Sequence, residues 1–168
     1  ANLVNNLNNS GEFVTGVSNY IALEPQLEMF KKIKPNMKTL GFLYNPSEAN
    51  SVSLIKNLEA ICPKFGIKLV TQVASQTSEV MQATQKLAST VDAIFISNDS
   101  TALSAIQIIV KVAKDQKIPV FVSDTDIVKD GPLAALGPNQ YEIGKQTAAI
   151  IVRVINGEEI SKIPTQFP

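Results

Sequence analysis

The sequence predicts an α/β fold in which helices cover both faces of a parallel sheet, giving three layers. Apolar runs of strand length alternate along the chain with longer stretches of helical period, and this alternation is typical of βαβ units. The runs over residues 40–44 and 93–96 are continuously apolar, as expected for strands that are buried on both faces. A chain of 168 residues with 45% hydrophobic residues is long enough to build one such core.

The predicted strands are recognised by their length and by the turn residues between them. Residues 67–73 alternate between apolar and polar side chains, which indicates a strand near an edge of the sheet. The strands at 39–44, 93–96 and 119–122 are expected side by side and parallel in the middle of the sheet. Two short strands are expected at 14–17 and 133–136.

The predicted helices are marked by apolar spacing and by residues typical of helix ends. Pro25 stands in the first turn of a helix over 24–34, which Pro35 ends. A second helix ends at Gly66, which stands where a C-terminal cap belongs, and Pro63 loosens its last turn. The remaining helices are expected over residues 78–88, 100–116 and 140–156, with Gly157 as the last cap.

The composition argues against several classes of function. The 15 basic residues balance the 15 acidic ones, so no basic surface for nucleic acid or anionic lipid is expected. There is no histidine, which is the commonest general base and zinc ligand. The single Cys62 has no base partner and is expected to be a small apolar residue on a helix. Because glycine-rich phosphate loops and clusters of metal ligands are missing, we expect neither a cofactor nor a metal.

The ends of the chain favour a piece of a longer protein. The chain begins with Ala1-Asn2-Leu3, without an initiator Met, and ends at Pro168 without a helix or a polar tail. We expect residues 1–12 to be the remnant of a preceding segment. Residues 13–168 are expected to form one α/β ligand-binding lobe.

Polar residues follow three of the predicted strands, over 45–51, 97–101 and 123–126. Ligands of an open parallel sheet bind beyond the carboxyl ends of its strands. A zwitterionic or a polyhydroxylated ligand needs such a set of polar groups. A zwitterion would find N–H groups near 47–51 for its carboxylate, and Asp99 or Asp124 for its ammonium. The predicted ligand-binding residues are Asn45, Ser47, Glu48, Asn50, Ser51, Asn98, Asp99, Ser123 and Asp124.

The same loops also have a purely structural interpretation. Asn45, Pro46 and Glu48 form a pattern typical of a helix capping box, and Asp99 suits the start of a helix. A small α/β enzyme that uses Asp99 or Asp124 is the alternative from the enzyme class. No activated nucleophile is paired with a base in this sequence, so binding is favoured over catalysis.

A set of stretches at and around these loops carries a resemblance to a known family. The most specific is Asn-Pro-Ser-Glu-Ala-Asn-Ser over 45–51; the others are residues 14–20, 41–44, 92–95, 98–100, 117–125, 133–137 and 143–147. In these the chain resembles ABC-transporter substrate-binding proteins of the type that includes tryptophan- and other aromatic amino acid-binding members. The resemblance covers nearly the whole chain, and residues 127–130 and 138–141 depart from it.

The resemblance implies a type I periplasmic-binding-protein-like fold, of which this chain would be the second lobe. Such proteins trap a small molecule, here an amino acid, in the cleft between two lobes joined by a hinge. The resemblance further implies a periplasmic protein or surface-anchored lipoprotein whose partner is a membrane permease, with no nucleic acid. A sensory lobe that reports a ligand to a receptor or regulator is the alternative from the binding class.

Overall fold

The computed structural model describes residues 13–20 and 22–167, and these fall into two compact units. The larger unit, Ala22–Gly137, is called the sheet unit below. The smaller, called the helical unit, contains residues 13–20 and 138–167. The expected remnant over residues 1–12 lies outside the described residues. None of the described helices is both long and apolar enough to cross a bilayer.

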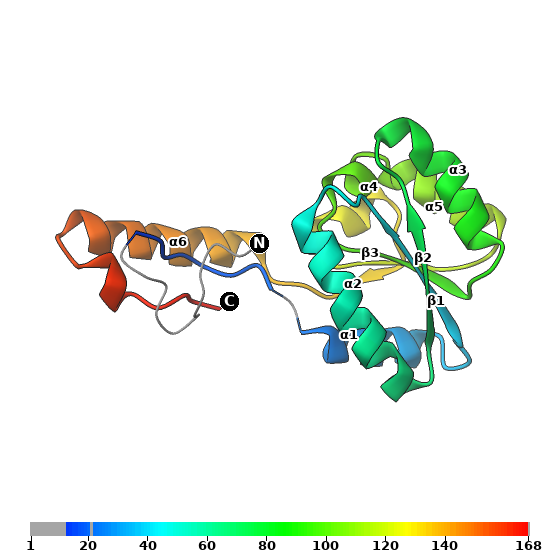
Figure 1. Ribbon diagram of the computed structural model, residues 1–168, viewed down its shortest axis with the longest axis horizontal. Helices are drawn as coiled ribbons and strands as arrows, with labels where there is room; N and C mark the ends of the chain where they lie inside the picture. The colour runs from blue at the N-terminus through cyan, green and yellow to red at the C-terminus, as the bar shows by residue number, and fades with distance from the viewer. Residues whose placement is uncertain (1–12, 21, 168) are drawn as a thin grey trace. The chain divides into compact units, whose positions relative to one another are not determined.

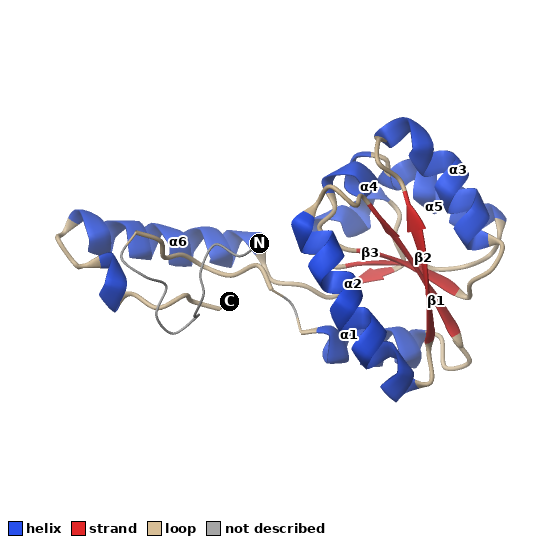
Figure 2. Cartoon of the chain, viewed as in Figure 1, coloured by secondary structure: helices blue, strands red, loops and turns tan. Residues whose placement is uncertain are grey.

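The sheet unit is built on a five-stranded sheet with the strand order β2-β1-β3-β4-β5 (Figure 2). All neighbouring strands are parallel, so the predicted α/β class is confirmed. β1, β3 and β4 lie side by side in the middle, and β2 lies at an edge, as the sequence predicts. The strands are β1 Thr39–Tyr44, β2 Lys68–Val73, β3 Ala93–Ile96, β4 Val120–Val122 and β5 Ala134–Ala135.

Helices cover the two faces of the sheet as separate layers (Figure 1). α1 and α2 share one buried cluster with Phe42, Phe95 and Phe121 of the strands. α3 and α5 share the other cluster with residues such as Ile94 and Val122, whose side chains point to the opposite face because side chains alternate along a strand. The helices are α1 Leu23–Ile33, α2 Ala49–Ile61, α3 Thr77–Ala88, α4 Ser100–Ser104 and α5 Ile106–Asp115.

Stacked aromatic rings fix α1 on its face of the sheet. The strand register places Phe42 beside Phe95, and Phe95 beside Phe121. The ring of Phe30 on α1 stacks on Phe121 with 4.3 Å between ring centroids and also contacts Phe95 at 5.3 Å. Aromatic pairs of this kind contribute about 0.5–1.5 kcal/mol beyond the area that they bury. The stack therefore holds α1 in one position along the sheet.

The structure corrects some of the predicted boundaries. Residues 14–17 form no strand; Val17 makes only an isolated parallel bridge to Gln166. The helix expected over 100–116 is two helices, because the backbone at Ala105 leaves the helical region with φ −116° and ψ 21°. The helix expected to end at Gly66 closes in a 3₁₀ turn, Cys62–Phe65, since Pro63 cannot donate the N–H of an α-helical turn.

The helical unit contains α6, Gln140–Ile155. The Asn139 side chain caps α6 by accepting the N–H groups of Tyr141 and Glu142 at 2.9 and 3.2 Å. Gly157, with φ 91°, follows its end, in agreement with the predicted cap. Tyr141 and Ile155 are 73% and 77% exposed, so α6 presents large apolar side chains to solvent.

Gly41 on β1 is required by close packing, and its replacement should destabilise the sheet unit. A Cβ atom at this position would lie 2.8 Å from Cγ of the buried Leu87 and 3.0 Å from Val91. We expect Gly41→Ala to lower the free energy of unfolding by about 1–3 kcal/mol, measured by urea denaturation. Gly144→Ala is the matched control, because a Cβ there meets nothing within 4 Å. Equal stability of the two variants would contradict the packing argument.

Asp92 should give the folding stability a component that depends on pH. Its carboxylate accepts the N–H groups of Lys38 and Thr39, both at 2.8 Å. Chiefly the bond from Lys38, then those from Thr39 and the charge of Lys34, hold the pKa of Asp92 below its ordinary value against the opposing effect of burial.

Because the folded pKa of Asp92 is the lower one, its stabilisation is complete above the unfolded pKa of about 4 and is lost as the pH falls through the folded pKa. Asp92→Asn should therefore be less stable at neutral pH and should lose less further stability below about pH 4. Urea denaturation across this range measures both effects. Asp115→Asn, at an exposed position, should keep the wild-type pH profile; an unchanged profile for Asp92→Asn would refute the assignment.

Candidate functional site

The strand order places a switch point between β1 and β3. From β1 the sheet continues to β2 on one side, and from β3 to β4 and β5 on the other. In open parallel sheets the crevice for a ligand lies beyond the carboxyl ends of the two strands where the order reverses. The loop from β1 to α2 and the loop from β3 to α4 follow these two strands and contain most of the predicted site residues.

The Asp99 carboxylate joins these two loops. Asp99 is 0% exposed, and one of its carboxylate oxygens accepts the N–H of Asn45 at 2.8 Å and the hydroxyl of Ser51 at 2.7 Å. The other oxygen accepts the N–H of Ala102 at 3.0 Å and caps α4. Asp99 thus fixes the loops through internal hydrogen bonds.

A second set of contacts bridges the same loops nearer the surface. The Glu48 carboxylate accepts the N–H of Ser100 at 2.9 Å and that of Thr101 at 3.3 Å. The side-chain amide of Asn50 donates to the backbone carbonyl of Asn98 at 2.8 Å. Glu48 therefore caps α4, the helix of the neighbouring loop, rather than acting in a capping box for α2.

Asn45 shapes the loop that precedes α2. Its amide oxygen accepts the N–H of Ser47 at 2.9 Å, and its amide nitrogen donates to the hydroxyl of Thr101 at 2.9 Å and to the carbonyl of Ser75 at 3.2 Å. α2 begins at Ala49 without any side-chain cap. The N–H groups of its first turn are therefore a place where an anion is stabilised.

Ser123 and Asp124 follow β4, the next strand of the sheet. The Ser123 hydroxyl donates to the buried Gln26 side chain of α1 at 3.1 Å. One oxygen of Asp124 accepts the N–H of Asp126 at 2.9 Å at the start of a 3₁₀ helix, Thr125–Asp130. Among the described residues, no side-chain hydrogen bond joins this pair to the loops after β1 and β3. The backbone N–H of Ser123 bonds to the Ile96 carbonyl at 3.1 Å, which keeps this loop next to that of β3.

Two buried polar atoms at the switch point have no hydrogen-bond partner among the described residues. They are the hydroxyl oxygen of Ser97 and the amide oxygen of Asn98. Ser97 is only 5% exposed. Leaving a buried polar group unpaired costs about 1–3 kcal/mol, so these two atoms distinguish the switch point from the rest of the described sheet unit.

Sequence reasoning missed Ser97 and Gln26. The position of Ser97 in the sequence could have indicated it. Ser97 is the first residue beyond β3, as Ser123 is the first beyond β4, and the last residues of these two strands pair with each other. Gln26 has no such signal, since a glutamine on a helix is ordinarily exposed. Here it is buried and accepts the bond from Ser123.

Features of catalysis are weak in the described part of the chain. Burial raises the pKa of the Cys62 thiol to about 11, so it is protonated at neutral pH and is a poor nucleophile. Within residues 13–20 and 22–167, no group of three or more acidic or cysteine side chains is placed to hold a metal ion.

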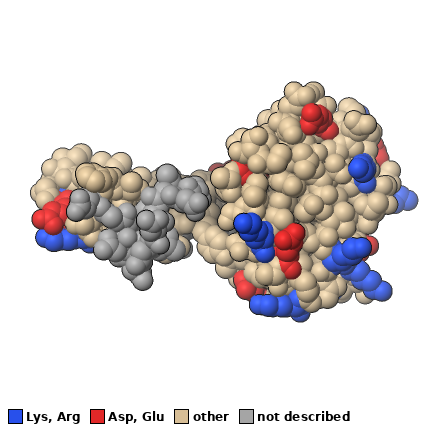
Figure 3. Space-filling view, in the orientation of Figure 1, with Lys and Arg blue, Asp and Glu red and all other residues tan. Residues whose placement is uncertain are grey.

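Figure 3 shows basic and acidic side chains next to one another on the visible face of the sheet unit.

Comparisons with known proteins agree on one family. The model of the family described as ABC transporter substrate binding protein matches residues 1–167. A tyrosine-binding protein of Clostridioides difficile is 32% identical over 164 residues, which are 98% of this chain and 48% of that protein. The chain therefore spans about half the length of the curated relatives it matches.

Solved structures show the same fold. A conserved domain protein from Vibrio cholerae is 39% identical with a TM-score of 0.94, and the match covers 99% of this chain and 56% of that one. An ABC domain in complex with L-Trp from Streptococcus pneumonia is 32% identical with a TM-score of 0.92, over 99% of this chain and 57% of that one.

Removing the Asp99 carboxylate should destabilise the sheet unit. Asp99→Ala leaves the N–H groups of Asn45 and Ala102 and the hydroxyl of Ser51 without their acceptor. We expect the free energy of unfolding to fall by about 2–4 kcal/mol, measured by urea denaturation. The exposed Asp126 gives the control Asp126→Ala, expected within about 0.5 kcal/mol of wild type. A loss below about 1 kcal/mol for Asp99→Ala would argue against its structural role.

Proposed function

Because the chain belongs to the family of ABC transporter substrate-binding proteins, we propose that it captures a small molecule for an ABC importer. In this proposal the ligand binds at the crevice beyond β1 and β3 and is passed on, chemically unchanged, to a membrane permease. The deep burial of the Cys62 thiol and the internal use of the Asp99 carboxylate both favour binding over catalysis.

The proposed ligand is an amino acid with an aromatic side chain. Support comes from a relative named as a tyrosine-binding protein and from a similar structure in complex with L-Trp. The chemistry of the crevice fits the part that all amino acids share. It offers acceptors for an ammonium group and the uncapped first turn of α2 for a carboxylate.

The unpaired amide oxygen of Asn98 is the observation that carries the assignment of the site. An ammonium group has three donors and no acceptor, so it can satisfy this oxygen and that of Ser97 together. Asp124 supplies the negative charge on the same edge of the sheet, since among the described residues only one of its oxygens accepts a hydrogen bond. Asp99, whose carboxylate is buried and bonded to three internal donors, acts as a positioning residue.

The ligand carboxylate is assigned to the first turn of α2. This helix of 13 residues begins without a side-chain cap, and its dipole favours an anion at that end by about 0.3–1 kcal/mol. The hydroxyl of the exposed Ser47 lies one residue before Glu48, the N-cap. The N–H groups in the first turn of α2 then bind the ligand. The loop before them is held in shape by the side chains of Asn45, Glu48, Asn50 and Ser51.

The complete binding site is proposed to need more chain than these residues. Small-molecule sites bury about 70–90% of a ligand's surface, and the curated relatives are about twice as long as this chain. The exposed apolar side chains of α6 are consistent with further chain packing on the helical unit. We place the protein outside the cytoplasm, in the periplasm or as a surface lipoprotein, as the second of two lobes that close on the ligand.

Calorimetric titration of the longer protein with L-tryptophan and L-tyrosine tests the proposal. Asn98→Ala and Asp124→Ala should each weaken binding by about tenfold, because each removes a charge-assisted hydrogen bond of about 1.5–3 kcal/mol. Asp126→Ala is the control for a charge removed two residues from Asp124.

Ligand analogues make the assignment specific. N-acetyl-L-tryptophan has no ammonium group, so wild type should bind it poorly, and Asn98→Ala should weaken that binding no further. Wild-type affinity of both Asn98→Ala and Asp124→Ala for the free amino acids would refute the ammonium site. Absence of binding to any aromatic amino acid would refute the proposed ligand class.

A further inference from the structure

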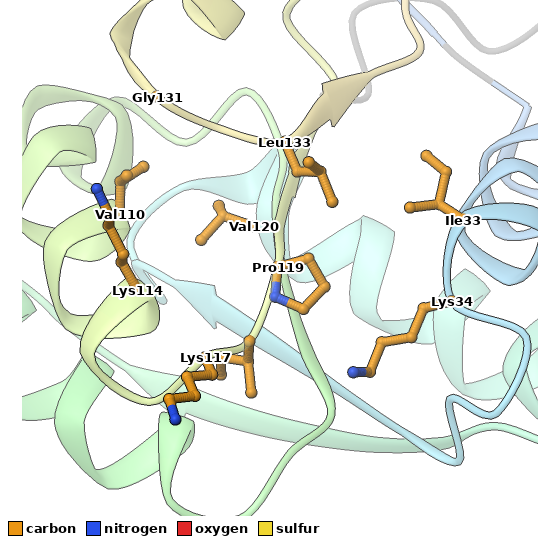
Figure 4. Close-up of a pocket in the computed structure, with 10 residues that line it drawn as sticks. Ile33, Lys34, Val110, Lys114, Lys117, Pro119, Val120, Gly131 and Leu133 are labelled. Atoms are coloured by element: carbon orange, nitrogen blue, oxygen red, sulfur yellow. The ribbon is translucent and has the colours of Figure 1, made fainter.

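The sheet unit has a groove at the end of the sheet opposite the candidate site (Figure 4). Its floor is formed by Pro119 and Val120 at the start of β4 and by Leu133, which immediately precedes β5. The last turns of α1 and α5 flank it from the two helical layers. Its volume of about 440 Å³ lies within the range of roughly 300–1,000 Å³ for small-molecule sites.

The lining combines apolar surface with positive charge. Ile33 and Leu133 are 43% and 57% exposed, so large apolar side chains face the solvent here. Lys34, Lys114 and Lys117 also line the groove, and no acidic residue does. Figure 4 shows Lys34 on one side of Pro119, with Lys114 and Lys117 on the other. In the part of the chain that the structure describes, none of these lysines belongs to an ion pair within 4 Å.

One wall of the groove depends on a close backbone approach. Gly131 has φ +116°, and a Cβ atom there would lie 2.8 Å from Cγ1 of Val110. Both residues line the groove. A glycine at this position lets the chain pass tightly over α5 before it enters β5.

We propose that this groove binds an organic anion with an apolar body, a carboxylate or sulfonate attached to an aliphatic or aromatic group. The apolar part lies against Ile33 and Leu133, and the anionic group lies among Lys34, Lys114 and Lys117. This site is separate from the amino acid site, because it opens at the amino ends of β4 and β5 whereas the other lies beyond carboxyl ends. It does not rest on the proposed import function.

A structural explanation for the lysines also exists and can be separated by experiment. Lys114 lies in the last turn of α5, where a cation stabilises the helix dipole. Lys86 lies in the last turn of α3, is exposed and does not line the groove. Lys86→Gln is therefore the matched control, since it removes the same charge from the same helical position.

Fluorescence titration of the whole chain with 1-anilinonaphthalene-8-sulfonate tests the proposal. N-phenyl-1-naphthylamine, which has a similar ring system without the sulfonate, is the neutral comparison probe. We expect the double variant Lys34→Gln/Lys114→Gln to bind the sulfonate about tenfold more weakly, with wild-type affinity in Lys86→Gln. Leu133→Ala should weaken both probes, because it removes apolar wall and no charge.

The remaining measurements separate the groove from other sites. L-tryptophan should leave the bound sulfonate in place, whereas decanoate and 2-naphthoate should displace it and reveal whether aliphatic or aromatic bodies fit better. The proposal is wrong if the sulfonate does not bind, if the double variant binds it like Lys86→Gln, or if L-tryptophan displaces it. None of these outcomes bears on amino acid binding by the longer protein.

Discussion

The buried carboxylate of Asp99 is the interaction on which the arrangement of the candidate site depends. Asn45 donates to it from the loop after β1, Ser51 from the first turn of α2, and Ala102 from α4. A buried charge is stable only when it is paired or fully hydrogen-bonded, so the two loops can take up only arrangements that keep these donors in place. The geometry of these two segments is consequently fixed by hydrogen bonds within the chain.

The division of labour at the switch point follows from the same bonds. Asp99 and Glu48 each accept a backbone N–H of the neighbouring segment, and the amide oxygen of Asn45 accepts one of its own loop. The side chains of Ser97 and Asn98 each keep a buried oxygen without a partner among the residues that the structure describes. The polar groups that attract attention in the sequence thus largely hold the two loops in shape. This arrangement is common where a rigid scaffold presents a few convergent polar groups to a ligand.

Sequence reasoning predicted those parts of the fold that depend on local pattern. β3 is found at the predicted residues, because a short unbroken apolar run suits a parallel strand that is buried on both faces. The interruption of the helix at Ala105 could not be predicted, since no proline or glycine marks it. The meeting of the loops after β1 and β3 followed from topology. Which side-chain atoms of these loops lack a partner among the described residues could not be predicted. It depends on hydrogen bonds between residues about 50 positions apart, such as Ser51 and Asp99.

The two edges of the sheet end its hydrogen-bonding ladder by different means. β5 pairs over only two residues, Ala134–Ala135, and so offers little backbone to another chain. β2 is a full strand, but it begins at the exposed Lys68 and carries polar side chains such as Gln72 along its length. Short and lysine-bearing edges discourage pairing between sheets of different molecules. These two edges therefore disfavour edge-to-edge aggregation of the sheet unit.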